Sequence, residues 1–185
     1  MSIFAIGDLH LPGHAQKPMD VFGSHWDRHF ETISDHWRRM VTPGDVVLIP
    51  GDISWAMQLG EALDDLHAIA ALPGRKLLLR GNHDYWWSSL SKLRAALPEG
   101  MFALQNDALA LDGHVFCGTR GWMFPTAQQP LGEQDEKVFR RELMRLRMSL
   151  DQAARLHGED LTVLMHYPPL FADGVSTDFT DILEE

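Results

Sequence analysis

Short apolar runs alternate along the chain with longer segments of helical periodicity, a pattern typical of α/β proteins. Two turn pairs, Asn106-Asp107 and Asp112-Gly113, separate three of the runs, which are therefore predicted to form an antiparallel meander. The predicted strands are Ile3–Ile6, Val46–Pro50, Lys76–Arg80, Met101–Gln105, Ala108–Leu111, His114–Gly118 and Leu161–Met165.

Three segments carry apolar residues at spacings of three and four, which predicts amphipathic helices. They run from Trp26 to Met40, from Leu59 to Ala70, and from about Glu133 to His157. Several arginines of the third segment lie off its apolar stripe. A solvated helix face next to acidic neighbours explains them better than a nucleic-acid surface.

Length, charge and cysteine content narrow the class of protein. The chain has 185 residues, enough for a single domain over 1–185. Its formal net charge of −10 repels nucleic-acid phosphates and anionic lipids, so we expect no nucleic-acid partner and no membrane association. The N-terminus lacks a signal-peptide pattern, which favours a cytoplasmic location. With Cys117 as the only cysteine, a thiolate zinc cluster is excluded.

Candidate metal ligands follow four of the predicted strands directly. Polar groups at the carboxyl ends of neighbouring strands converge on one edge of an α/β sheet. Asp and His supply oxygen and nitrogen ligands without sulfur, which suits Mn²⁺, Zn²⁺ or iron better than Ca²⁺. One such motif alone is usually a turn, whereas four in order predict a site. The motifs are Gly7-Asp8-Leu9-His10, Gly51-Asp52, Gly81-Asn82-His83-Asp84 and His166-Tyr167-Pro168-Pro169.

These motifs resemble the first four signature blocks of the calcineurin-like metallophosphoesterases, and in particular a bacterial branch with poorly defined substrates. The resemblance implies an α/β fold of four layers, in which two mixed β-sheets pack face to face between flanking helices. It also implies two divalent metal ions, Mn, Fe or Zn, bound at one rim of the sheets.

The resemblance assigns metal-binding roles position by position. Asp8 and His10 hold the first metal, Asp52 bridges the two metals, and Asn82 and His166 hold the second. Three protein ligands for each metal are therefore expected from this chain.

Two catalytic residues follow from the same resemblance. His83 contacts the phosphoryl group and protonates the leaving oxygen, and Asp84 orients His83. Arg120 follows a predicted strand and is a candidate phosphate clamp, with a surface ion pair as the equal alternative. Aromatic residues beside the ligand loops either form a wall for a base or pack in the core. These are Trp55, Tyr85, Trp86 and Trp87.

The family's fifth block, Gly-His-x-His, does not occur in the chain. We therefore expect the C-terminal strands of the second sheet to be missing, and a homodimer through an exposed sheet edge to be one outcome. The predicted function is hydrolysis of a phosphate mono- or diester by metal-activated water, with a phosphate-ester small molecule or nucleotide as substrate. The alternative is a truncated, weakly active or non-catalytic binding or scaffold module with the same fold.

Overall fold

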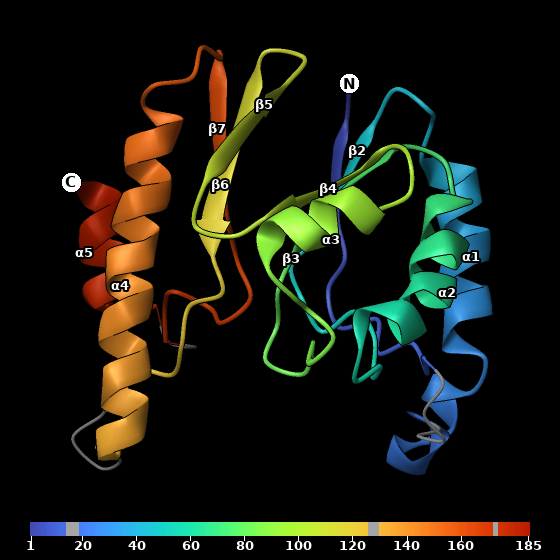
Figure 1. The fold of residues 1–185 in the computed structure, drawn as a ribbon, viewed down its shortest axis with the longest axis horizontal. Coiled ribbons are helices and arrows are strands. Elements are labelled where there is room, and N and C mark those ends of the chain that lie inside the picture. The colour runs from blue at the N-terminus through green and yellow to red at the C-terminus, as the bar shows by residue number, and fades with distance from the viewer. Residues whose placement is uncertain (14–18, 126–129, 172–173) are drawn as a thin grey trace. The chain divides into compact units, whose positions relative to one another are not determined.

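The computed structural model describes residues 1–13, 19–125, 130–171 and 174–185, apart from the side chain of His25. The chain divides into two compact units, residues 1–103 and 104–185, and each is described by itself. Both units combine helices with a β-sheet (Figure 1), so the predicted α/β class with two sheets is confirmed. A single domain over 1–185 stays a prediction.

The first unit is built on a four-stranded sheet. Its strands follow the order β1 (Ile3–Ala5), β2 (Val46–Ile49), β3 (Arg75–Leu79) and β4 (Met101–Leu104). Strands β1, β2 and β3 are parallel neighbours. All four residues of β2 are buried, which explains its unbroken apolar run. Because parallel strands end at the same edge, the loops after β1, β2 and β3 start side by side.

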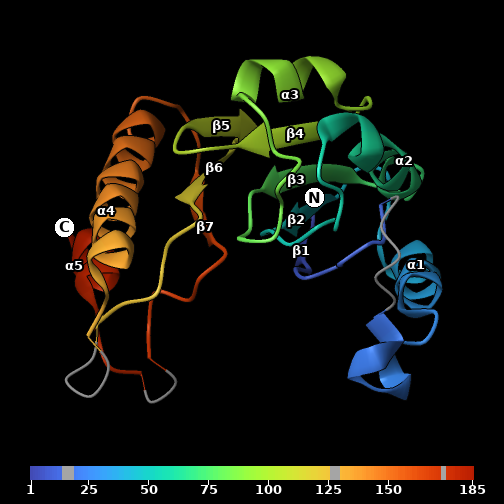
Figure 2. The ribbon, with the colours of Figure 1, turned by 60° about the horizontal axis from the view of Figure 1, so that its bottom comes forward.

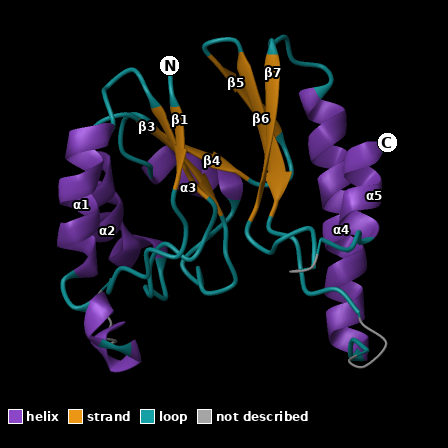
Figure 3. Cartoon of the chain, turned by 180° about the vertical axis from the view of Figure 1, so that it is seen from behind, coloured by secondary structure: helices purple, strands orange, loops and turns teal. Residues whose placement is uncertain are grey.

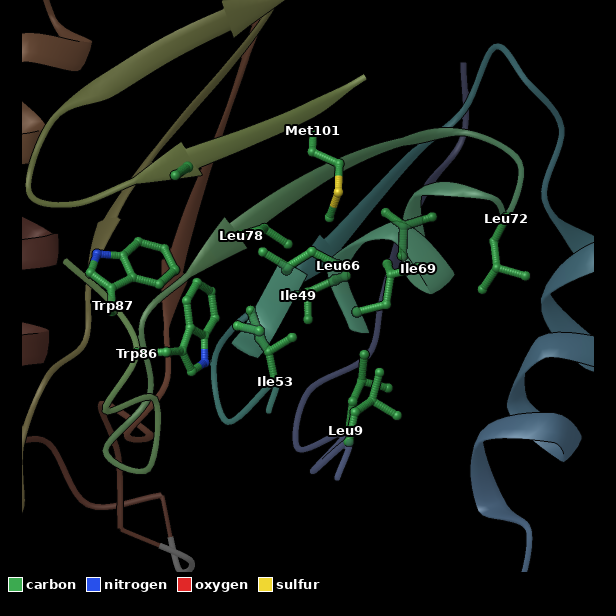
Figure 4. Packing of buried hydrophobic residues seen from close by; sticks show 14 of the residues in the cluster. Leu9, Ile49, Ile53, Leu66, Ile69, Leu72, Leu78, Trp86, Trp87 and Met101 are labelled. Atoms are coloured by element: carbon green, nitrogen blue, oxygen red, sulfur yellow. The ribbon is translucent and has the colours of Figure 1, made fainter. Parts of the chain in front are cut away.

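Helices α1 (His29–Met40) and α2 (Leu59–Ala70) lie next to each other in this unit (Figure 1). Helix α3 (Leu90–Ala96) lies beside β4 (Figure 2), where the Nη2 of Arg94 donates to the Ala103 carbonyl at 2.7 Å. All three helices pack with one face of the sheet in a shared apolar cluster (Figure 4). Two short 3₁₀ helices, Met19–Phe22 and Ser24–Trp26, precede α1.

Helix α2 has a satisfied polar group at each end. At the N-terminus Gln58 and Glu61 form a reciprocal capping box. At the C-terminus the ammonium group of Lys76, a residue only 2% exposed, donates to the carbonyls of Ala70 and Leu72. A lysine from β3 therefore holds the end of the neighbouring helix.

The second unit contains a mixed sheet of three strands (Figure 3), β5 (Ala108–Leu111), β6 (His114–Thr119) and β7 (Asp160–Met165). Strands β5 and β6 are antiparallel, and β6 and β7 are parallel. Helix α4 (Glu133–Ala153) packs against β6 and against α5 (Asp178–Glu184). Cys117 is fully buried in β6, as expected of a small core residue, and burial raises the pKa of its thiol to about 11.

All seven predicted strands are confirmed, each with ends within one residue of the prediction. The predicted three-stranded meander is wrong, because β4 joins β3 in the first sheet and only β5 and β6 form a hairpin. Asp112 and Gly113 both have positive φ there, 50° and 81°, as a type I′ turn requires.

Two predicted helix ends also differ. Helix α1 begins at His29 rather than Trp26, because Arg28 takes the left-handed conformation at φ 51° just before it. Helix α4 ends at Ala153 rather than His157. Arginines of α4 pair with acidic neighbours, Arg140 with Glu136 at 2.8 Å for example, which agrees with a solvated helix face.

None of the helices in the described ranges has the length and apolar character needed to cross a membrane. A cytoplasmic location stays a prediction. Strand β1 occupies the end of the four-stranded order. A homodimer through this sheet edge likewise stays a prediction.

Candidate metal centre

The loops that follow β1 and β2 are held together by their backbones. The N–H groups of Asp8 and His10 donate to the carbonyls of Gly51 and Asp52, at 3.0 and 2.9 Å. Leu11 N–H continues the series to the next carbonyl, that of Ile53, at 2.9 Å. The two loops therefore run side by side beyond the strands, and this pairing fixes the register of the side chains they carry.

Asp8, His10 and Asp52 come together at this edge of the sheet, and one ligand atom from each lies within 4.8 Å of the others. The Nε2 of His10 is 3.7 Å from Oδ1 of Asp8 and 3.8 Å from Oδ2 of Asp52. These three residues are predicted ligands, and the structure brings them into one group.

The same three residues share an unusual backbone conformation. Asp8, His10 and Asp52 have φ values of 55°, 44° and 52°, in the left-handed region that non-glycine residues rarely occupy. Such a conformation costs of order 1–3 kcal/mol at each residue and persists where the surroundings enforce it. Strain gathered on the ligand group is the pattern expected of a functional site.

The group suits a divalent transition metal. Two carboxylates and one imidazole offer oxygen and nitrogen donors, and the three converging atoms leave room for a cation between them. Burial lowers the pKa of His10, although Asp52 and Asp8 act in the opposite direction. The lowered pKa favours the neutral imidazole, which is the form that binds a metal.

The carboxylate of Asp84 is fully buried and ties the loop after β2 to the loop after β3. Its two oxygens accept five hydrogen bonds of 2.8–3.3 Å. The donors are the backbone N–H groups of Asp52, Ile53, Ser54 and Gly81 and the indole N–H of Trp86.

These contacts differ from the predicted orienting bond between Asp84 and His83. Among the described residues, the His83 ring is not one of the donors to Asp84. Burial raises the pKa of the Asp84 carboxyl, while the backbone N–H donors act in the opposite direction. Since all five neighbours are donors, the ionised carboxylate is the form that fits them.

The loop after β3 approaches Asp52 closely. The backbone N–H of His83 donates to Oδ1 of Asp52 at 2.8 Å. A Cβ at Gly81 would overlap the carboxylate and the backbone nitrogen of Asp52, so only glycine fits there. Asn82 lies between these two residues in the loop. Oδ2 of Asp52, the other oxygen, is the one directed toward His10.

Aromatic rings surround the two histidines of the site. Trp55 stacks on His10 with centroids 4.8 Å apart and lies 4.9 Å from His83. Tyr85 is 52% exposed and meets the His83 ring edge-on at 6.3 Å.

For Trp86 and Trp87 the other predicted alternative, packing in the core, holds. They are 1% and 5% exposed and pack in the core (Figure 4). Of the four aromatic residues beside the ligand loops, Trp55 and Tyr85 are therefore the ones next to the candidate centre.

His166 and Arg120 belong to the second unit. His166 follows β7, and its backbone N–H donates to the Arg120 carbonyl at 3.2 Å. The guanidinium of Arg120 lies 3.6 Å from buried Glu142 and 4.5 Å from the centre of the Trp122 ring. These contacts hold Arg120 in place within its unit. Its role as a phosphate clamp stays a prediction.

One residue beside the site belongs to none of the four sequence motifs. His29, the first residue of α1, has its Nε2 atom 2.8 Å from the carbonyl oxygen of Leu9, between Asp8 and His10. An isolated histidine twenty residues from the loop gives no pattern that sequence reasoning can detect.

Comparison with known proteins agrees with the motifs. The sequence profile described as calcineurin-like phosphoesterase matches residues 1–183. The chain therefore belongs to the calcineurin-like phosphoesterase family. Membership supports a metal-dependent phosphoesterase, a hydrolase with bound divalent metal, and the group Asp8, His10 and Asp52 is in keeping with it.

Two individual proteins show partial similarity. The gene 66 protein of Mycobacterium phage D29 is 38% identical over 85 residues, which are 45% of this chain and 40% of that protein. The crystal structure of AQ665, a protein of unknown function from Aquifex aeolicus, superposes with a TM-score of 0.44 and 17% identity. This alignment covers 78% of the present chain and 74% of the other.

Proposed function

We propose that this chain hydrolyses a phosphate mono- or diester by attack of an activated water at a dinuclear metal site. The observation that carries the proposal is the group of Asp8, His10 and Asp52, whose ligand atoms lie within 4.8 Å of one another. The match to the phosphoesterase profile supports the reaction class. Bound metal ions would activate the water and offset charge on the phosphoryl oxygens.

Residues of the ligand loops would bind the metals. Asp8 and His10 would hold one metal together with Asp52, whose Oδ2 is directed toward His10. The family resemblance gives Asp52 a share in the second metal as well. Asn82 would contribute to the second metal, and the role of His166 as a ligand of that metal, which the family resemblance implies, stays a prediction. Manganese, iron and zinc all match this donor set.

His83 would contact the substrate and would not bind a metal. Its backbone is fixed by the hydrogen bond to Asp52, and its ring lies next to the rings of Trp55 and Tyr85. The ring would donate a proton to the leaving oxygen. Asp84 would hold the loops after β2 and β3 together by accepting hydrogen bonds from their backbones, so that Asp52 and His83 keep a fixed distance.

The substrate class follows from the same surroundings. A half-buried Trp55 and an exposed Tyr85 offer flat apolar surface beside His83. A nucleotide or an aryl phosphate would place its ring there. A phosphate-ester small molecule or nucleotide is therefore the proposed substrate.

The test measures hydrolysis of bis-p-nitrophenyl phosphate and p-nitrophenyl phosphate with Mn²⁺, together with Mn²⁺ binding by calorimetry. Asp52→Asn should lose turnover by two orders of magnitude or more, because one bridging charge is removed. Asp151→Asn, an exposed position on α4, serves as the matched control and should behave as wild type. Equal rates in wild type and Asp52→Asn would refute the proposal. Metal binding without turnover would favour the scaffold alternative.

A further inference from the structure

The imidazole of His29 lies between two backbone carbonyls. Its Nε2 is 2.8 Å from the oxygen of Leu9, and its Nδ1 is 3.1 Å from the oxygen of Trp26. Leu9 is the residue between Asp8 and His10. We propose that His29 is a positioning residue that holds the peptide between Leu9 and His10, and thereby sets the affinity of the site for a divalent cation. The proposal rests on the metal site of the proposed function.

The peptide unit that joins Leu9 to His10 is bound at both of its polar ends. Its N–H donates to the Asp52 carbonyl at 2.9 Å. Its C=O accepts from the Nε2 of His29 at 2.8 Å when that nitrogen carries the proton. One bond therefore comes from the neighbouring ligand loop, and the other comes from helix α1.

This peptide matters because rotating it changes φ of His10. His10 has φ 44°, a conformation that costs free energy and tends to relax to negative φ. A rotated peptide would point the Leu9 carbonyl away from His29 and would break the bond from His10 N–H to the Asp52 carbonyl, which pairs the two ligand loops. The bond from His29 opposes that relaxation.

Leu9 and His29 are themselves well anchored. The Leu9 side chain is fully buried in the core of the first unit (Figure 4). His29 is the first residue of α1, and the Trp26 ring meets its edge with centroids 5.2 Å apart. A rigid donor on a helix and a buried residue next to the acceptor give the hydrogen bond a fixed geometry.

Three substitutions separate the donor from the rest of the ring. His29→Gln places an amide N–H near the position of Nε2 and keeps the bond to Leu9. His29→Asn places its amide near the position of Nδ1, within reach of the Trp26 carbonyl but not of the Leu9 carbonyl. His29→Leu removes both ring nitrogens and retains an apolar side chain.

The readout is the affinity for Mn²⁺ alone, measured by calorimetry on protein first treated with chelator. His29→Leu and His29→Asn should bind Mn²⁺ about 10- to 100-fold more weakly than wild type, the usual loss when a group that orients a ligand is removed. His29→Gln should restore most of the affinity. The thermal midpoints of the metal-free His29→Asn and His29→Gln proteins should be the same.

Each other outcome has a definite meaning. Unchanged Mn²⁺ affinity in His29→Leu overturns the positioning role, and so does a His29→Gln protein that binds as weakly as His29→Leu. Affinities that merely follow the metal-free midpoints overturn it as well, because they indicate a purely structural role. Wild-type protein that binds Mn²⁺ but hydrolyses no ester refutes the proposed function and leaves the role of His29 standing. Wild-type protein that does not bind Mn²⁺ refutes both.

Discussion

Asp84 is the residue on which the geometry of the candidate centre depends most. Its carboxylate is the shared acceptor for N–H groups from the loop after β2 and the loop after β3. Each oxygen accepts at least two hydrogen bonds, and the group has no exposure to solvent. The left-handed conformation of Asp52 is therefore maintained partly by a side chain thirty-two residues away.

We predict that Asp84→Asn lowers the free energy of unfolding by about 2–4 kcal/mol, the usual cost of leaving buried donors unsatisfied. In either orientation of the asparagine amide, its NH₂ group faces N–H groups that now donate to a carboxylate oxygen. Those N–H groups would lose their acceptor. Mn²⁺ binding should weaken in parallel, because Asp52 loses its fixed position. Urea denaturation and calorimetry measure the two effects, with Asp151→Asn as the control. A stability change below 0.5 kcal/mol would contradict the role that we assign to these hydrogen bonds.

Some residues of the site can be predicted from the sequence and others cannot, for a physical reason. Asp8, His10 and Asp52 could be predicted, because each follows a strand within three to five residues and carries metal-binding chemistry. The partners of Asp84 and the contact of His29 with Leu9 could not. They depend on groups that meet across twenty to thirty-two residues of sequence, and no local pattern encodes such contacts.

Among the elements, strands were easier to predict than short helices. Strand β2 is entirely buried and is a continuous apolar run, and β3 ends in three consecutive buried leucines. Helix α3 has seven residues and buries only Leu93, which is too little periodicity to recognise. The sequence predicts strand β4 but not its partner. Pairing with β3 instead of β5 is decided by tertiary packing and not by the turn that follows β4.

Lys76 supplies a prediction for the junction of β3 and α2. Burial lowers the pKa of its ammonium group from 10.5 to about 8. Between these two pH values the unfolded chain binds more protons at this residue than the folded chain, so the free energy of unfolding should rise with pH. Below about pH 8 both states are protonated, and burial of the charge imposes its full cost.

Lys76→Met should abolish this rise, because methionine does not titrate. The informative quantity is the difference in unfolding free energy between wild type and Lys76→Met, followed from pH 7.5 to about 10 by urea denaturation. Taking the difference removes the contribution of Cys117 and other groups common to both proteins. A difference that stays constant with pH would show that the carbonyls of Ala70 and Leu72 keep the buried lysine at its ordinary pKa.

On the scale of the whole molecule, the net charge of −10 complicates any measurement of metal binding. Twenty-six acidic residues attract cations over the entire surface, and this attraction weakens with salt. A specific site differs in two ways. Its affinity depends on one small group of ligands, and its imidazole favours Mn²⁺ or Zn²⁺ over Ca²⁺.

We therefore predict that Mn²⁺ raises the thermal midpoint of chelator-treated wild type in about 0.15 M salt, where surface attraction is largely screened. At a concentration 100-fold above the dissociation constant, binding to the folded state alone adds about 2.7 kcal/mol to its stability. The same concentration of Ca²⁺ should raise the midpoint less. Asp52→Asn should show no rise with Mn²⁺, whereas Asp151→Asn should match wild type, since both variants lose one negative charge but only the first loses a ligand. An equal rise in both variants would mean that Mn²⁺ acts through the acidic surface and not through Asp8, His10 and Asp52.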